Sequence, residues 1–320
     1  MKRVLVILVT HNGMHWLSRC LGSVAPSGKN ANFPDGQVLT DVYVVDNDST
    51  DGSADWIQAN YPAVKLVRSA DNLGFTLANN LGFDYAMAKG YDYVYLLNQD
   101  AWLEEGAIEK LVAAAEAHPE YAVLSPLQMT DGFREYDNQF AKLMTVPEGI
   151  HFLNRRFATP PTLWAPPSYD AEGGTDSGSV YPPEPISIPR VMAAHWLMRM
   201  EAVKQVGKFS ELFPYYGQDD DWCNRAKYHG WKIGIVPQAR AVHERAQRKE
   251  SKDRIIDRNY RVGSLVRLCD INRPLWERFL FVCLFTLVKS VKYFSFLPIK
   301  HFIGICKKLP DLVTLRNSYK

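Results

Sequence analysis

Short polar clusters follow three apolar runs in the first hundred residues, and their side chains could bind a ligand and a metal ion. The clusters are Thr10-His11-Asn12, Asp46-Asn47-Asp48 and Asn98-Gln99-Asp100. Mg²⁺ prefers one or two protein carboxylates, with phosphate oxygens and water completing its shell. Asp100, with Asn98 two residues before it, is therefore a candidate metal ligand. The alternative is a turn or a helix cap, which the same residue types favour.

A second candidate for chemistry is the run Asp219-Asp220-Asp221 at the start of a predicted helix. Acidic residues favour helix N-termini, so capping is the alternative, but three adjacent carboxylates exceed what capping needs. The aromatic neighbours Tyr215, Tyr216 and Trp222 predict a partly desolvated surrounding. Desolvation raises the pKa of a carboxyl group and makes it a better general base.

Alternating strands and helices must position these residues. We expect strands over 3–10, 41–46, 64–68, 91–97 and 121–125, and helices over 14–24, 53–59, 75–89 and 104–118. This alternation predicts an α/β fold with a mostly parallel central sheet flanked by helices. Right-handed crossovers then place the carboxyl ends of all these strands at one edge, where open α/β sheets bind ligands.

The second half of the chain is less regular. Residues 126–190 are rich in proline and predict an irregular insertion, either a surface insertion or a functional segment that serves as a lid or an acceptor-binding loop. Extended segments over 186–199, 231–236 and 239–243 and short helices over 201–206 and 219–229 follow. His243 ends the last extended segment, and a lone histidine is by itself weak evidence for a metal ligand.

Residues 246–320 predict a basic, amphipathic helical tail, with helices over 253–269 and 274–292. From residue 241 to the end, 17 lysines and arginines stand against 7 acidic residues. The uncharged run 279–288 is far shorter than the ~20 residues that cross a bilayer. We expect helices lying on an anionic membrane surface. The alternative is packing on the body or across a homodimer interface. No nucleic-acid-binding motif is present.

Composition is that of a globular protein. Of 320 residues, 47% are hydrophobic and 22% are charged, which excludes a disordered or coiled-coil chain. Five scattered cysteines without paired spacing argue against a disulfide scaffold or a structural zinc site and favour a reducing cytosol. The apolar run 4–9 is too short for a signal peptide. A dinucleotide-binding oxidoreductase is excluded because no Gly-x-Gly-x-x-Gly turn follows the first strand.

Six segments in order resemble the family 2 glycosyltransferases with the GT-A fold. They are Val-Leu-Val-Ile-Leu-Val-Thr-His-Asn at 4–12, Val-Val-Asp-Asn-Asp-Ser-Thr-Asp-Gly-Ser at 44–53, Asn-Leu-Gly-Phe at 72–75 with Ala-Asn-Asn-Leu-Gly at 78–82, Leu-Leu-Asn-Gln-Asp at 96–100, Phe-Pro-Tyr-Tyr-Gly-Gln-Asp-Asp-Asp-Trp-Cys-Asn-Arg at 213–225, and Val-Pro-Gln-Ala-Arg-Ala-Val-His at 236–243. The branch they resemble most is the rhamnosyltransferase-like one.

The resemblance implies an inverting, metal-dependent transfer of a sugar from a nucleotide diphosphate donor. The donor-binding side chains that it implies are Thr10, Asn12, Asp46, Asp48, Asn72, Asn79, Asn98 and Asp100. Asp100 and His243 would bind Mg²⁺ or Mn²⁺, and Asp219 would deprotonate the acceptor hydroxyl. The side chains expected on the acceptor side are His195, Trp196, Gln218 and Asp221.

Two positions depart from the family pattern. Asn98 stands where a first metal-binding aspartate is usual, and Gln218 stands where a glutamate usually precedes the base. Both changes remove a negative charge. They leave one alternative open, a non-catalytic scaffold that binds a nucleotide sugar through a decayed site.

The resemblance also sets expectations for partners and place. The expected donor is deoxythymidine diphosphate rhamnose first and a UDP sugar second. The expected acceptor is a glycan or a lipid-linked glycan in surface polysaccharide assembly, on the cytoplasmic face of the cell membrane. Residues 1–245 would form the glycosyltransferase domain, with a nucleotide-sugar half (1–125), the insertion (126–190) and an acceptor half (191–245). The tail (246–320) would follow.

Overall fold

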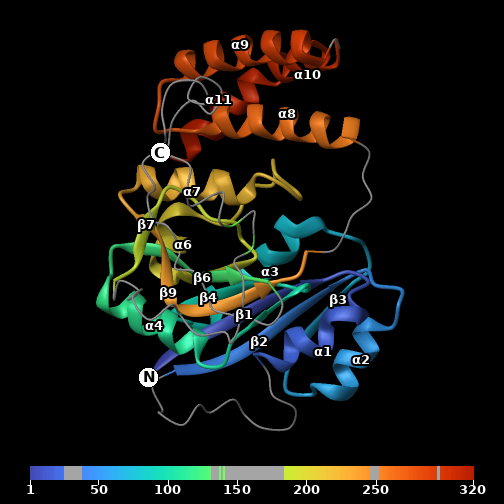
Figure 1. Ribbon diagram of the computed structural model, residues 1–320, viewed down its shortest axis with the longest axis vertical. Coiled ribbons are helices and arrows are strands. Elements are labelled where there is room, and N and C mark those ends of the chain that lie inside the picture. Colours follow the sequence, from blue (N-terminus) through green and yellow to red (C-terminus); the bar gives the residue numbers. More distant parts are fainter. Residues whose placement is uncertain (25–37, 131–136, 138–139, 141–183, 246–251, 294–295) are drawn as a thin grey trace.

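A computed structural model describes the chain except for residues 25–37, 131–136, 138–139, 141–183, 246–251 and 294–295 (Figure 1). In the described residues one central sheet is flanked by helices, and a layer of further helices lies beyond it. Most of the predicted insertion 126–190 lies outside the described residues. The described residues of this segment include the end of the strand Tyr121–Met129 and the short strand Ile186–Ile188.

The described part of the chain forms a nine-stranded sheet in the order β3-β2-β1-β4-β8-β6-β9-β5, with β7 paired to β9. The strands are β1 (Lys2–Thr10), β2 (Val38–Asn47), β3 (Lys65–Ser69), β4 (Tyr93–Asn98), β5 (Ala101–Leu103), β6 (Tyr121–Met129), β7 (Ile186–Ile188), β8 (His195–Arg199) and β9 (Lys232–His243). Four neighbouring pairs are parallel: β1 with β2, β1 with β4, β2 with β3, and β6 with β9. The predicted α/β architecture is confirmed.

The five strands expected in the first half of the chain, β1, β2, β3, β4 and β6, run in one direction, because β8 pairs antiparallel with both β4 and β6. Their carboxyl ends therefore lie at one edge as expected, whereas β5, β7 and β8 run the opposite way. The strand β8 inserts between β4 and β6, which separates two groups of parallel strands. The ends of β1, β2 and β4 still meet, because Thr10 pairs with Asp46 and Val9 pairs with Asn98.

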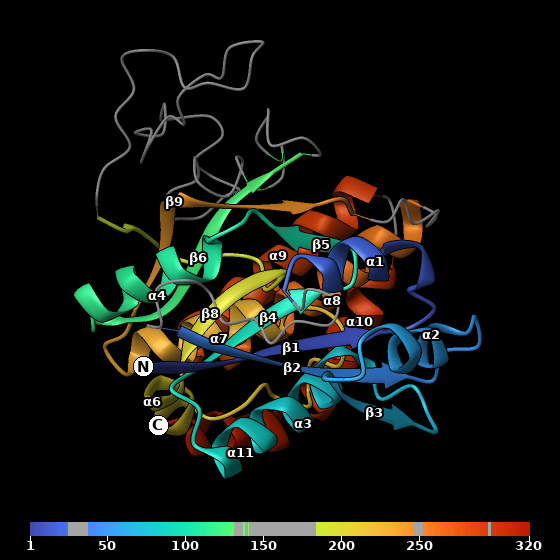
Figure 2. The ribbon, with the colours of Figure 1, turned by 90° about the horizontal axis from the view of Figure 1, so that it is seen from below.

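Helices cover both faces of the sheet, because alternate residues of each buried strand point to opposite sides. Leu5 and Ile7 pack with α3 (Gly74–Lys89), α6 (Met200–Val206) and α7 (Gln218–Tyr228). Val6 and Leu8 pack with α1 (Met14–Gly22), α2 (Ser53–Asn60) and α4 (Ala107–Ala117). Figure 2 shows α1 and α3 on opposite sides of β1 and β2. The two cores hold the strand ends in fixed register.

The described residues of the basic tail form four helices: α8 (Lys252–Cys269), α9 (Leu275–Tyr293), α10 (Leu297–Lys307) and α11 (Leu309–Ser318). Their own apolar core includes Val282, Ile305 and Leu312, and it also takes in Phe213 from the loop before α7. The helix α8 therefore lies between α7 and α9 (Figure 1). Among the described residues, each helix is too short or too polar to cross a lipid bilayer.

Candidate active site

The side chain of Gln99 ties the end of β4 to the end of β1. Its Oε1 accepts hydrogen bonds from the Thr10 hydroxyl and from the His11 backbone N–H, both at 2.8 Å. A Cβ at Gly13 would lie 2.3 Å from Thr10 Oγ1 and 2.6 Å from Gln99 Oε1, so only glycine fits this close approach. These contacts hold the cluster Thr10-His11-Asn12 against the cluster Asn98-Gln99-Asp100.

The same rim continues to the end of β2 and then to the loop before α7. The carbonyl of Asn47 accepts a hydrogen bond from His11 Nδ1 at 2.8 Å, and the Asn47 amide donates to Asn72 Oδ1 at 2.9 Å. The Tyr215 hydroxyl donates to the same Asn72 oxygen at 3.2 Å. Side chains from three strand ends and the Tyr215 loop therefore form one connected polar rim.

The other predicted donor-binding residues lie along this rim. Asn12 (φ 49°) and Asp48 (φ 67°) both adopt the left-handed backbone that asparagine and aspartate tolerate. Asn12 Oδ1 accepts the Thr50 N–H at 2.8 Å, which joins the loops after β1 and β2. Asp48 is exposed, and Asp46 is buried, with Oδ2 accepting the Ser49 N–H at 3.3 Å.

The predicted metal ligands lie together. The short strand β5 pairs with β9 so that Ala101 faces His243, which brings Asp100 Oδ1 within 3.4 Å of His243 Nε2. Both side chains are mostly buried, and Asn98 precedes them on β4. The described residues hold no cluster of three or more His, Cys, Asp or Glu ligands. A carboxylate and an imidazole nevertheless suit Mg²⁺ or Mn²⁺ when phosphate oxygens and water supply the remaining ligands.

Asp219 stands in the first turn of α7, after a loop that is anchored to α3. The backbone N–H groups of Phe75 and Thr76 donate to the Pro214 carbonyl at 2.9 and 3.1 Å. Burial and the neighbouring Asp220 carboxylate raise the pKa of Asp219 from 3.8 to about 7. A carboxyl group with a pKa near 7 suits a general base at neutral pH.

Arg190, which lies between β7 and β8, places a positive charge near this base. Its guanidinium donates to Asp220 Oδ1 at 2.8 Å, while Asp219 Oδ1 accepts the Asp220 N–H at 2.9 Å. The positive charge of Arg190 opposes the rise in the pKa of Asp219. The sequence reasoning missed Arg190, because nothing near it in the chain marks it as part of the site.

Four predicted site residues are buried and contact other parts of the protein. Trp196 is fully buried and packs on Trp222. His195 is also fully buried; its Nε2 donates to the Val242 carbonyl at 3.0 Å, its Nδ1 accepts the Tyr95 hydroxyl at 2.9 Å, and burial lowers its pKa to about 3. Asp221 is buried in an ion pair with Arg225 (2.9 Å), so it supports α7 instead of facing an acceptor. Asn79 is 2% exposed and donates to Phe75 within its own helix.

Two exposed aromatic residues lie where the buried Trp196 was expected to act. Tyr215 and Tyr216 are 52% and 38% exposed, and they stand four and three residues before Asp219. The guanidinium of Arg258, from α8, lies 4.3 Å from the ring centre of Tyr216. The sequence already places these two tyrosines beside the acidic run, but only the folded structure shows that their side chains are exposed.

Five predicted site residues carry buried polar atoms without a hydrogen-bond partner among the described residues. They are Asp46 Oδ1, Asn98 Oδ1, Trp196 Nε1, Gln218 Oε1 and His243 Nδ1. Buried polar atoms are nearly always paired in folded proteins, so each such atom needs an explanation. A bound ligand would explain those of Asp46, Asn98, Gln218 and His243, whereas Trp196 lies in the core and unpaired atoms also occur outside the predicted site, as on Thr40 and Gln128.

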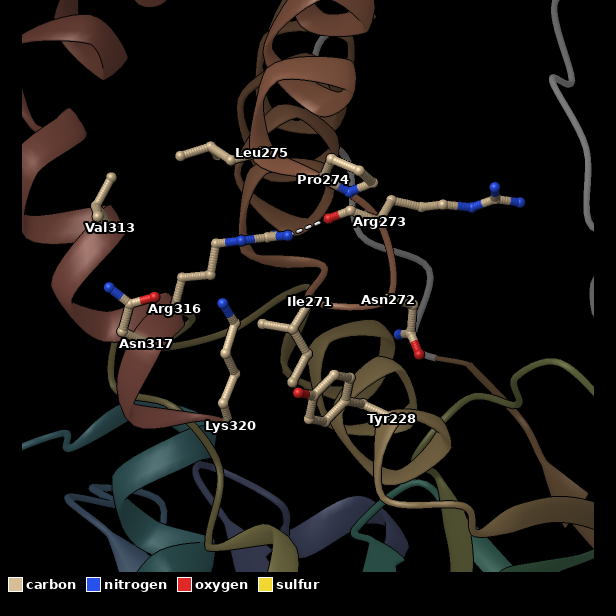
Figure 3. Close-up of a pocket in the computed structure, with 10 residues that line it drawn as sticks. All are labelled: Tyr228, Ile271, Asn272, Arg273, Pro274, Leu275, Val313, Arg316, Asn317 and Lys320. Carbon is tan, nitrogen blue, oxygen red and sulfur yellow. Dashed lines mark hydrogen bonds between the residues drawn. The ribbon is translucent and has the colours of Figure 1, made fainter.

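A hollow of about 410 Å³ lies elsewhere, between α11, the turn from α8 to α9 and the end of α7 that is distant from Asp219 (Figure 3). Its lining includes Tyr228, Arg316 and Lys320 but none of the predicted site residues. The Arg316 side chain donates to the carbonyls of Leu268, Asp270 and Arg273. This arginine therefore joins the helices of the tail.

Comparison with known proteins identifies the class. The family model "Glycosyl transferase family 2" matches residues 5–167, which include the first three polar clusters. The chain belongs to glycosyl transferase family 2, and it is a glycosyltransferase.

The chain is also similar to a protein of known name. It is 26% identical over 249 residues to the N-acetylglucosaminyl-diphospho-decaprenol L-rhamnosyltransferase of Mycobacterium tuberculosis. The match covers 75% of this chain and 76% of the relative. The same relative from a second strain matches equally. The expected likeness to the rhamnosyltransferase branch is confirmed.

Two solved structures share the fold. Residues 1–349 of S. aureus TarS in complex with UDP align with a TM-score of 0.52 and 15% identity, over 88% of this chain and 70% of that one. GalNAc-T7 with UDP, GalNAc and Mn²⁺ aligns with a TM-score of 0.55 and 16% identity, over 83% of this chain and 48% of that one. At these identities the likeness shows the GT-A fold alone.

Proposed function

We propose that this protein is an inverting, metal-dependent glycosyltransferase that moves rhamnose from deoxythymidine diphosphate rhamnose to a glycan or lipid-linked glycan. The observation that carries the proposal is the combination of unpartnered buried polar atoms on Asp46, Asn98, Gln218 and His243 with the Asp219 carboxyl group, whose pKa is about 7. A nucleotide sugar and an acceptor hydroxyl would pair these atoms.

The donor would lie along the connected polar rim. The buried Asp46, with one free oxygen, would accept from the base or the ribose, and Thr10, Asn12 and Asp48 would shape that end. Asn98 would face the ribose or the phosphates. Asp100 and His243 would hold Mg²⁺ or Mn²⁺ with oxygens of the diphosphate. When bound, the cation would offset the charge on the departing nucleoside diphosphate.

Asp219 would remove the proton from the acceptor hydroxyl while that oxygen attacks the anomeric carbon. A single base on the side opposite the leaving diphosphate gives one displacement, which inverts the anomeric configuration. Gln218 Oε1 would accept a hydrogen bond from the acceptor. Tyr215 and Tyr216, both exposed beside Asp219, would offer faces on which a sugar ring stacks.

The choice of rhamnose and of a lipid-linked acceptor is supported by the name of the mycobacterial relative, at 26% identity. The UDP bound to TarS, a structure of the same fold, keeps UDP sugars as the second donor class. A lipid-linked acceptor would place the enzyme on the cytoplasmic face of the cell membrane as a peripheral protein. The basic tail suits that location.

The substitution Asp219→Asn tests the catalytic proposal. We expect sugar transfer or donor hydrolysis to fall by about 10²–10⁴, which is the usual contribution of a general base. Nucleotide binding, measured by calorimetry, should stay within a few-fold of wild type because Asp219 is not a donor ligand. Asp311→Asn, at an exposed position of α11, is the matched control and should keep full turnover. Full turnover in Asp219→Asn would contradict the assignment, and absent turnover in wild type would favour the scaffold alternative.

A further inference from the structure

The helix α9 carries a continuous row of exposed apolar side chains. Trp276, Leu280, Leu284, Leu287 and Val291 follow at intervals of three and four residues, so they share one face of the helix. Each of them is between 53% and 72% exposed. Single exposed apolar residues are ordinary, but a continuous row of five marks a surface that contacts a partner.

Contacts among the described residues leave this row of apolar side chains exposed. The opposite face of α9 supplies Val282, which is fully buried, to the core of the tail, and Phe279 packs there against Phe302 of α10. Figure 1 shows α9 on the side of α8 that points away from the sheet. The row therefore faces outward, and polar substitutions in it should leave the core intact.

The charge around the row is positive. Over residues 270–320, nine lysines and arginines stand against three acidic residues. Arg273 and Lys292 are exposed near the two ends of α9, Lys300 and Lys307 are exposed on α10, and Lys308 is exposed between α10 and α11. An apolar helix face with basic residues beside it is the pattern of a helix that lies in the interface of an anionic bilayer.

We propose that the outer face of α9 docks on the surface of an anionic lipid bilayer. The inference deepens the proposed function and rests on it in one respect, namely that the acceptor is lipid-linked. The row would enter the boundary between head groups and acyl chains, and the basic side chains would contact lipid phosphates.

A second copy of the chain fits this face less well. A two-fold dimer places the same patch against itself. Arg273 and Lys292 of both copies would then meet, and the acidic residue available within α9 is Glu277 alone. The surrounding positive charge would thus oppose self-association, whereas it would favour contact with an anionic membrane.

Docking through α9 would bring the catalytic loop close to the membrane. The other side of the tail touches that loop directly, because a Cβ at Gly217 would lie 2.7 Å from Val262 and 3.0 Å from Val266, both on α8. Gly217 stands two residues before Asp219. The helix layers α8 and α9 would therefore lie between the bilayer surface and the loop that carries the base.

Flotation of the full chain with vesicles tests the proposal. The probes are vesicles of phosphatidylcholine alone and of phosphatidylcholine with phosphatidylglycerol. We expect wild type to bind the anionic vesicles, to bind neutral ones weakly, and to lose binding as salt rises. The triple variant Leu280→Gln/Leu284→Gln/Leu287→Gln should bind at least about tenfold more weakly. The matched control Leu77→Gln/Leu81→Gln, on the exposed side of α3, should bind as wild type does.

Two further readouts separate the outcomes. Donor hydrolysis without acceptor should be unchanged in the triple variant, so lost vesicle binding with intact hydrolysis isolates the docking face from the proposed catalysis. If hydrolysis were absent in wild type while vesicle binding followed the predicted pattern, only the proposed function would fail. Wild type that ignores anionic vesicles, or a triple variant that binds like wild type, would overturn the proposal. A dimer seen by light scattering that the triple variant abolishes would instead assign the face to self-association.

Discussion

Asp219 has the electrostatic surroundings of a base that works near neutral pH. Burial and the like charge of Asp220 raise its pKa to about 7, and Arg190 opposes that rise. The carboxyl group must be deprotonated to accept a proton, so its competence grows with rising pH and is lost below its pKa. We therefore expect kcat/KM to fall about tenfold per pH unit below pH 7.

The variant Arg190→Gln tests this charge balance. Removing the positive charge should raise the pKa of Asp219 further, so the acidic limb of the pH profile should move to higher pH. Activity at pH 6 should then fall more than activity at pH 8, and Arg190→Lys should restore part of the wild-type profile. An acidic limb that stays in place while the rate drops equally at all pH values would mean that Arg190 acts only in folding or packing.

At the residue scale, the sequence predicted which distant side chains lie close together better than it predicted their exposure. Asp100 and His243 meet as expected, although they are 143 positions apart in the chain. Trp196 and His195 were expected on the acceptor side but lie in the core, because β8 is buried on both faces of the sheet. No local pattern around these two residues distinguishes a fully buried strand from one that borders the site.

The close packing of α3 on β1 depends on a glycine. A Cβ at Gly82 would lie 2.6 Å from Ile7 Cγ2 and 2.7 Å from Ile7 Cδ1, and Ile7 is fully buried. We expect Gly82→Ala to lower the free energy of unfolding by about 1–3 kcal/mol through overpacking, despite the better helix propensity of alanine. Urea unfolding at equilibrium measures this change.

Gly304 offers a matched control on another helix. A Cβ there would meet nothing within 4 Å, so Gly304→Ala on α10 should be neutral or stabilising by up to about 1 kcal/mol. If Gly82→Ala proved as stable as Gly304→Ala, the contact of α3 with β1 would be looser than the structure places it.

Most elements were predictable because hydrophobic periodicity is local information. The strands β1 to β4 and the helices α1 to α4 begin and end within a few residues of their expected bounds. The direction of β8 was not predictable, because a buried apolar strand reads the same in parallel and antiparallel pairing. The short strand β5 and the helices α10 and α11 were also missed, since three residues carry little periodicity and the last 28 residues are mixed in polarity.

Across the whole molecule, the tail is part of the architecture that holds the site. Phe213, from the loop that leads to Asp219, lies in the core shared with α8, α10 and α11. The sequence indicated a basic helical tail, but its contact with Gly217 and Tyr216 depends on the order of four helices. The tail thus has two surfaces, one against the catalytic loop and one, the α9 row, facing outward.

Donor hydrolysis by the full chain tests the central proposal most directly. Nucleotide release would be measured for deoxythymidine diphosphate rhamnose and a panel of UDP sugars, with Mg²⁺, with Mn²⁺ and with a chelator, since slow hydrolysis needs no acceptor. We expect release from deoxythymidine diphosphate rhamnose that depends on the divalent cation and is lost in His243→Ala. Cation-dependent release from a UDP sugar alone would contradict the donor assignment, and neither release nor nucleotide binding would contradict the catalytic account itself.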